Sequence, residues 1–109
     1  MTKRSGFFVM YYVYIIYSET ADNYYVGYTD DMEKRLYRHN NSPFNSYTSK
    51  YRPWIVKACF NVGPDKKEAI KIERYIKHQK SRKFPEDLIT NRNNPEHFAQ
   101  LVRVPACRD

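Results

Sequence analysis

Two tyrosine-rich runs near the start of the chain constrain the fold most: YYVYIIY at 11–17 and YYVGY at 24–28. Both runs are rich in aromatic and β-branched residues, a composition typical of strands. The six residues between them, SETADN, favour a turn. The sequence therefore predicts that the two runs form an antiparallel hairpin.

Gly27 interrupts the second of these runs. Glycine weakens a strand and often marks a bulge or a close approach of another group. If Tyr17 pairs with Tyr24 around the turn, Tyr14 pairs with Gly27, which leaves space beside the Tyr14 ring. In this register Tyr14 and Tyr25 project from one face of the sheet. A bulge flanked by two core rings explains the segment equally well when it is taken alone.

The rest of the chain carries two D-x-x-E patterns, and each predicts a capped helix start. The predicted elements are a helix over 31–39 opened by Asp30 and Glu33, a strand over 54–62, and a helix from Asp65 and Glu68 to about Lys80. Residues 40–46 are predicted to be a loop, and Pro85 and Pro95 can each take the first position of a short helix. We expect an α+β fold, with a small three-stranded antiparallel sheet (β-β-α-β-α-α) flanked by helices.

The length of 109 residues fits one domain, and a hydrophobic content of 41% is enough for a core. We expect the domain at 10–102, a flexible N-terminal extension at 1–9 and a C-terminal tail at 103–109. The apolar run after the basic N-terminus resembles a signal peptide only superficially. It is rich in tyrosine, lacks a cleavage site and is too short to span a membrane. Met10 is an alternative start, and we expect no membrane partner.

The two cysteines, Cys59 and Cys107, lie far apart and show no metal-ligand spacing. Cys59 sits in an apolar run, which predicts a buried thiol. We therefore expect a reducing, cytoplasmic environment.

The formal net charge is +7, which favours a polyanionic partner such as nucleic acid. Residues 66–83 contain eight lysine or arginine side chains and only two acidic ones. Many basic domains bind no nucleic acid, so charge alone decides little. The candidates for contacts to a nucleic-acid backbone are Lys50, Arg52, Lys77, Lys80, Arg82 and Lys83. The aromatic residues of 47–54 can stack on an unpaired base or simply pack in the core.

Three polar residues are predicted to face the sheet. Arg35 and His39 lie four residues apart on one helix face, where a guanidinium can hold a phosphate and an imidazole can exchange a proton. Glu73 falls on the same stripe as Ala69 and Ile76, where a carboxylate is costly unless it is paired or holds a cation. Each feature alone fits a solvated helix or a salt bridge. Together with the tyrosines they supply the groups for phosphodiester cleavage.

Taken in order, YVY at 12–14, YVG at 25–27, Arg35, His39 and Glu73 resemble the motifs of the GIY-YIG nuclease superfamily, and above all its small single-domain bacterial branch. The likeness runs from about residue 10 to 94. It implies metal-dependent hydrolysis of DNA, for repair, recombination or processing, with Mg²⁺ or Mn²⁺ held by Glu73. The catalytic set that it implies is Tyr14, Tyr25, Arg35, His39 and Glu73, with Gly27 as the closing glycine at the nucleic-acid surface.

The chain departs from this pattern at several positions, and the middle isoleucine of each motif is a valine here, at Val13 and Val26. Tyr12 replaces the glycine of the first motif, and Thr48 stands where some homing-type members carry a further histidine. No second DNA-binding domain is recognisable, which leaves room for a targeting protein partner. Oligomeric state, RNA as a substrate and the identity of the general base stay open, the last among Tyr14, Tyr25 and His39. The alternatives are a nucleic-acid-binding module with little or no cleavage and a small basic scaffold.

Overall fold

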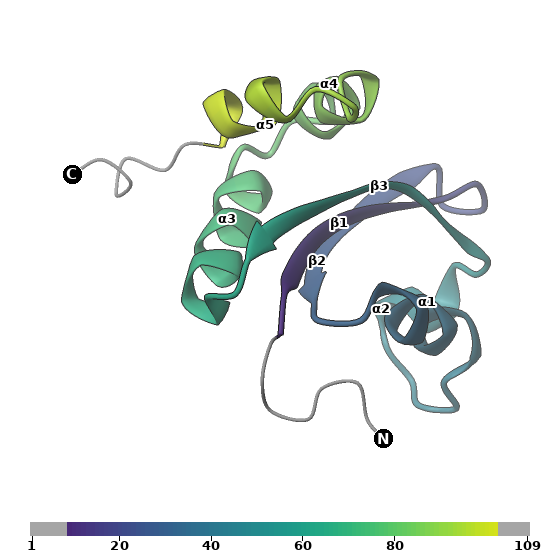
Figure 1. The fold of residues 1–109 in the computed structure, drawn as a ribbon. Coiled ribbons are helices and arrows are strands. Elements are labelled where there is room, and N and C mark those ends of the chain that lie inside the picture. Colours follow the sequence, from purple (N-terminus) through teal and green to yellow (C-terminus); the bar gives the residue numbers. More distant parts are fainter. Residues whose placement is uncertain (1–8, 103–109) are drawn as a thin grey trace.

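The computed structural model describes residues 9–102, so the predicted tail and nearly all of the predicted N-terminal extension lie outside the described residues, as does Cys107. Three strands, β1 (Tyr11–Ser18), β2 (Asn23–Thr29) and β3 (Trp54–Gly63), form an antiparallel sheet in the order β2-β1-β3 (Figure 1). The helices are α1 (Met32–Asn41), α2 (Tyr47–Lys50), α3 (Lys66–His78), α4 (Lys83–Thr90) and α5 (Pro95–Leu101). The predicted α+β class and three-stranded sheet are confirmed.

The predicted hairpin register is also confirmed. Tyr17 pairs with Tyr24 and Tyr14 pairs with Gly27. On its other side β1 pairs with β3, so Tyr14 also lies opposite Cys59. The central strand therefore brings Tyr14 between the two edge strands.

The element order contains two helices more than the predicted string. The four residues of α2 are too few for a periodic pattern, although Ser46 and Ser49 form a capping box at its start. α1 is capped by Asp31, whose carboxylate accepts from Lys34 N at 3.1 Å, rather than by Asp30. Pro85 is the third residue of α4 and not the first, whereas Pro95 opens α5 as predicted.

α3 is capped by Asp65, as predicted, but ends at His78 rather than near Lys80. Lys80 has a φ of 50°, in the left-handed region that a side chain makes unfavourable. At Lys80 the backbone leaves the helical conformation, and the chain turns toward α4.

The two faces of the sheet are covered by different helices (Figure 1). One face, which we call the apolar face, buries side chains of all three strands against α3, α4 and α5. Phe60 and Phe98 stack there with ring centroids 4.0 Å apart. The members of this cluster are Val13, Ile15, Val26, Ala58, Phe60, Ile72, Ile76, Leu88, Phe98 and Val102. Each large aliphatic side chain in it contributes roughly 1.5–3 kcal/mol by burial.

The opposite face, which we call the polar face, buries Tyr14, Ile16 and Trp54, with α1 packed against it. Trp54 anchors both α1 and α2. Its backbone N–H donates to Asn40 Oδ1 at 2.7 Å, and its indole N–H donates to the Thr48 carbonyl at 2.8 Å. These contacts hold the two helices at the end of the sheet where the candidate site lies.

The expectation of a buried thiol at Cys59 is wrong, because this side chain is exposed. Ala58 and Phe60 point into the apolar core, so alternation turns Cys59 to the polar face of an edge strand. Within residues 9–102, no helix has the length and apolar character needed to cross a membrane. The cytoplasmic location stays a prediction.

Candidate functional site

Tyr14 lies at the centre of the candidate site, and its side chain is fully buried. Its ring lies over Gly27 on the neighbouring strand. A Cβ added to Gly27 would lie 2.6 Å from Tyr14 Cζ, closer than atoms can approach. Gly27 is therefore needed for the Tyr14 ring to lie flat on the sheet, and the space predicted beside this ring is filled by the ring itself.

His39, from the last turn of α1, connects Tyr14 to α2. Its Nε2 lies 2.8 Å from the Tyr14 hydroxyl, and its Nδ1 lies 3.0 Å from Thr48 Oγ1. All three side chains are buried. With Nδ1 protonated, His39 donates to Thr48 and accepts from Tyr14, which satisfies every group in the chain. Thr48 was noted as standing where some homing-type members carry a histidine, but it was not among the predicted catalytic residues, and its contact with His39 was not predicted.

Burial sets the protonation of this chain. Desolvation raises the pKa of Tyr14 to about 12, although the nearby Arg35 guanidinium opposes the shift. Desolvation, with added repulsion from Arg35, Arg38 and Arg52, lowers the pKa of His39 to about 4. Both side chains are therefore neutral at pH 7. Tyr14 is therefore a phenol rather than a phenolate at this pH.

Tyr25 is the less buried of the two motif tyrosines. Its ring makes an edge contact with His39, with centroids 5.4 Å apart, and stacks on Tyr47. The Lys77 ammonium lies 5.3 Å from its ring centre, within range of a cation–π interaction. Tyr25 thus bridges the α1 side of the site and α3.

Glu73 reaches the site from the inner side of α3, where its side chain is only 13% exposed. It pairs with Lys77 at 2.6 Å, which explains how a carboxylate is tolerated beside Ile72 and Ile76. The charge of Glu73 raises the pKa of Tyr14, whereas that of Arg35 lowers it, so both lie within electrostatic range of the Tyr14 hydroxyl. The five predicted catalytic residues therefore gather around Tyr14 from β1, β2, α1 and α3.

The predicted divalent cation has one candidate protein ligand at this site, the Glu73 carboxylate. Within residues 9–102, no group of three or more His, Cys, Asp or Glu side chains could hold a metal ion. Glu73 would be the protein ligand, with water and phosphate oxygens completing the shell, as is usual for Mg²⁺. Lys77 shares the carboxylate and would have to move aside.

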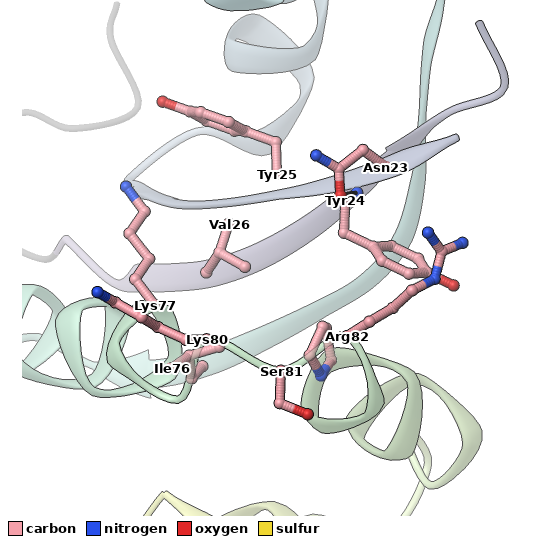
Figure 2. A pocket seen from close by; sticks show the side chains of 10 residues that line it. Asn23, Tyr24, Tyr25, Val26, Ile76, Lys77, Lys80, Ser81 and Arg82 are labelled. Carbon is pink, nitrogen blue, oxygen red and sulfur yellow. Dashed lines mark hydrogen bonds between the residues drawn. The ribbon is translucent and has the colours of Figure 1, made fainter. Parts of the chain in front are cut away.

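The residues predicted to contact a nucleic-acid backbone divide into three groups. Lys77, Lys80 and Arg82 line one cavity of about 310 Å³ between β2 and the α3–α4 turn (Figure 2). Arg52 is not free for such contacts, since it donates to the carbonyls of His39 and Ser42 at 2.7 Å each and so caps α1. Two further predicted residues, Lys50 on α2 and Lys83 on α4, are exposed.

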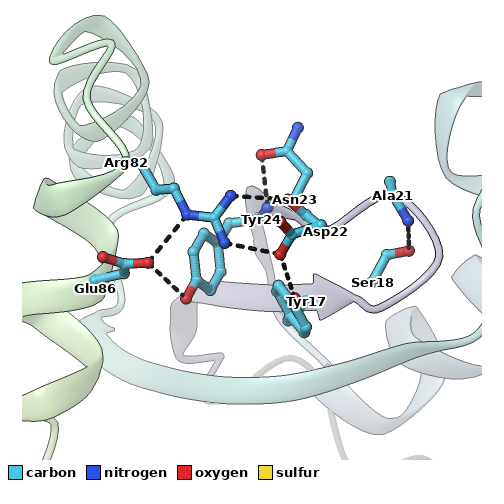
Figure 3. A network of polar contacts seen from close by, with 8 residues as sticks. All are labelled: Tyr17, Ser18, Ala21, Asp22, Asn23, Tyr24, Arg82 and Glu86. Carbon is cyan, nitrogen blue, oxygen red and sulfur yellow. Dashed lines mark hydrogen bonds and ion pairs between the residues drawn. The ribbon is translucent and has the colours of Figure 1, made fainter.

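Arg82 also belongs to a network that ties the hairpin turn to α4 (Figure 3). Its guanidinium pairs with Asp22 at 2.9 Å and with Glu86 at 3.0 Å, and it lies over the Tyr24 ring. The Tyr17 hydroxyl, and then Arg82, hold the pKa of Asp22 below its ordinary value. The charge of Arg82 is therefore largely balanced within the protein, which favours a structural role.

Known proteins resemble this chain over most of its length. The UPF0213 protein YsiG of Lactococcus lactis subsp. lactis is 35% identical over 96 residues, 86% of this chain and 88% of its own. The UPF0213 protein BH0048 of Halalkalibacterium halodurans is 32% identical over 85 residues, 78% of this chain and 87% of its own. A UPF0213 protein of Streptococcus pneumoniae is 36% identical over 84 residues, 75% of this chain and 81% of its own. These names do not describe an activity.

A profile of the GIY-YIG catalytic domain matches residues 10–86, which include every predicted catalytic residue. This is a nuclease domain, and its presence supports an endonuclease that acts on nucleic acid. The chain belongs to the GIY-YIG family.

Proposed function

We propose that this protein is a divalent-metal-dependent endonuclease that hydrolyses phosphodiester bonds in DNA, with a role in repair, recombination or processing. The observation that carries the proposal is the grouping of Tyr25, Arg35, His39 and Glu73 around the Tyr14 hydroxyl. With Tyr14, these side chains provide two phenols, an imidazole, a guanidinium and an inward-facing carboxylate. Pure binding of a polyanion has no use for Glu73 at this place.

Each group has a role in hydrolysis. The oxygen of a water molecule forms a bond to phosphorus and that water loses a proton to the surrounding solvent. The bond from phosphorus to the leaving sugar oxygen breaks, and this oxygen takes up a proton from solvent to become a hydroxyl. Arg35 holds the non-bridging phosphate oxygens, whose negative charge grows in the transition state. Glu73 would hold the divalent cation, which supplies a Lewis acid beside the phosphate when it is bound.

Tyr25 is the phenol best placed to touch the attacking water, because Tyr14 is fully buried whereas Tyr25 is only partly covered. Tyr14 and His39 are then positioning residues. Their 2.8 Å hydrogen bond keeps both rings fixed next to Tyr25 and Arg35. A pKa of about 12 for Tyr14 and of about 4 for His39 makes each a poor base at neutral pH in the free protein.

The test is cleavage of labelled duplex, single-stranded, flapped and branched DNA in Mn²⁺ or in EDTA. Glu73→Gln keeps the shape of the side chain and removes its charge, and Glu33→Gln on the exposed side of α1 is the matched control. We expect products only with Mn²⁺, lost in Glu73→Gln and retained in Glu33→Gln. Cleavage in EDTA, or full activity of Glu73→Gln, would refute the proposed role of this carboxylate.

A nucleic-acid-binding module is the second candidate. It is favoured by the Lys77–Glu73 pair, which already neutralises the carboxylate. It predicts salt-sensitive DNA binding with no products from any DNA in the panel, with or without Mn²⁺. The same assay, repeated as a binding measurement, separates the two candidates.

A further inference from the structure

The cavity between β2 and the α3–α4 turn adjoins the candidate catalytic site. Tyr25 and Lys77 line this cavity, and they also form the contacts that connect His39 to Glu73. In Figure 2 the Lys77 side chain extends past β2 toward Tyr25, whose ring lies on the opposite side of this strand from Val26, whereas Tyr24 and Arg82 lie near each other farther along the cavity. A DNA strand whose phosphate is held at Tyr25 and Arg35 would therefore have its neighbouring nucleotide at the mouth of this cavity.

The chemistry of the cavity suits a nucleotide. Its floor is apolar, since Val26, Ile76 and Pro85 are buried. Its rim is cationic, with Lys77 and Lys80 exposed on the α3 side. An apolar floor accepts the flat face of a base, and a cationic rim accepts the adjoining phosphate.

Lys80 is the rim cation that is free to meet a phosphate. Arg82 is already paired with Asp22 and Glu86, and Lys77 is paired with Glu73. Within residues 9–102, no ion pair or side-chain hydrogen bond involves Lys80. Its left-handed backbone, at a φ of 50°, places it at the turn beside the cavity.

The size and walls of the cavity argue for an unpaired base. A volume of about 310 Å³ is at the lower end of the range for small-ligand pockets, ~300–1,000 Å³. This volume is on the scale of one nucleotide. β2 closes one side and the α3–α4 turn closes the other, so a base inside it cannot stay paired with a complementary strand.

We propose that this cavity binds one unpaired nucleotide next to the scissile phosphate, so that the protein selects single-stranded or flapped DNA over continuous duplex. The inference rests on the proposed nuclease function, since it takes the cleavage site to lie at Tyr25 and Arg35. Base insertion gives the affinity, and Lys80 holds the phosphate that joins the inserted nucleotide to the next one.

The test is equilibrium binding in EDTA, so that no cleavage is required, to labelled single-stranded, flapped and duplex DNA of equal length. Ser81→Phe puts a bulky ring on the lining of the cavity at the α3–α4 turn, and Asn93→Phe puts the same ring on an exposed loop as the control. Lys80→Ala removes the rim charge, with Lys71→Ala on the exposed side of α3 as its control. Thermal unfolding shows whether each variant is folded.

We expect the wild type to bind single-stranded and flapped DNA about tenfold more tightly than duplex. Ser81→Phe and Lys80→Ala should remove most of this preference and leave duplex affinity within about twofold. Equal affinity of the wild type for all three DNAs would overturn the proposal, as would equal losses on all three in a folded Ser81→Phe. Lack of cleavage in the Mn²⁺ assay with this binding preference intact would refute the nuclease function and not the nucleotide site.

Discussion

The two faces of the sheet are built from the same three strands by the same alternation, yet they are filled differently. The apolar face buries aliphatic and phenylalanine side chains against three helices. The polar face buries a phenol, an imidazole and a threonine hydroxyl that form a continuous chain of hydrogen bonds. Burial on the first face stabilises the fold without orienting any reactive group. Burial on the second face fixes the orientation and the protonation state of polar side chains beside the candidate site.

The largest expected effect that distinguishes the two faces is that of Arg35→Ala on the cleavage rate. Removing a charge that stabilises a transition state lowers the cleavage rate by about 10²–10³-fold. Arg35 is half-buried at the rim, so the free energy of unfolding should change by less than about 1 kcal/mol. Rates per folded molecule and urea unfolding measure the two effects. Arg74→Ala, on the exposed side of α3, is the control, and an equal rate loss in both variants would mean that Arg35 has no special role.

Leu88→Ala should give the opposite result. Leu88 on α4 is 1% exposed in the apolar core, and such truncations cost about 2–5 kcal/mol of unfolding free energy. The rate per folded molecule should stay within about twofold, because the core cluster that contains Leu88 includes none of the five predicted catalytic residues. Urea unfolding and cleavage at a temperature where the variant is folded are the measurements. A rate that falls with stability would show that the two faces are not separable.

The protonation of His39 predicts a pH dependence of stability on the polar face. The unfolded chain takes up a proton at the ordinary pKa of 6.5, whereas the folded protein does so only at about 4. The unfolded state therefore binds more protons between these values, and stability is lost as pH falls from 6.5 to 4. The loss due to His39 is roughly 3 kcal/mol at most. Urea unfolding across this range should show it, and His39→Gln should flatten the slope; an unchanged slope in this variant would place the dependence elsewhere.

The smallest expected effect concerns Thr48. Thr48→Val keeps the shape of the side chain and leaves His39 Nδ1 without its partner, at a cost of about 1–2 kcal/mol. Thr48→Ser should retain most of the stability. Nitrogen chemical shifts of the His39 ring report which nitrogen carries the proton, and they should change in Thr48→Val only. If the two variants give identical chemical shifts, Thr48 does not determine the tautomer of His39.

The comparison also shows what the sequence could predict. The register of β1 and β2 followed from the turn and from Gly27, because pairing in a hairpin is determined once one pair is known. Glu73 was found because a charge on an apolar stripe is visible in the 3.6-residue period. Both predictions use only the spacing of residues along the chain. They do not require knowing which distant segments pack together.

Contacts between distant segments could not be predicted in this way. The Thr48–His39 contact depends on a four-residue helix that has no periodic pattern. Arg52 and Arg82 were grouped with the residues predicted to contact a nucleic-acid backbone, because a sequence does not say which cation meets a carbonyl or a carboxylate. Cys59 was misplaced because an apolar run was interpreted as buried on both faces, whereas β3 is an edge strand.

The most direct test of the division between the two faces is to locate Mn²⁺ on the isotopically labelled protein by paramagnetic broadening of its amide signals. We expect broadening around Glu73, Lys77 and Tyr25, and little broadening at Leu88 and Phe98 in the apolar core. In Glu73→Gln this broadening should be lost. Broadening that persists unchanged in Glu73→Gln, or that centres on another part of the molecule, would contradict the assignment of Glu73 as the metal ligand.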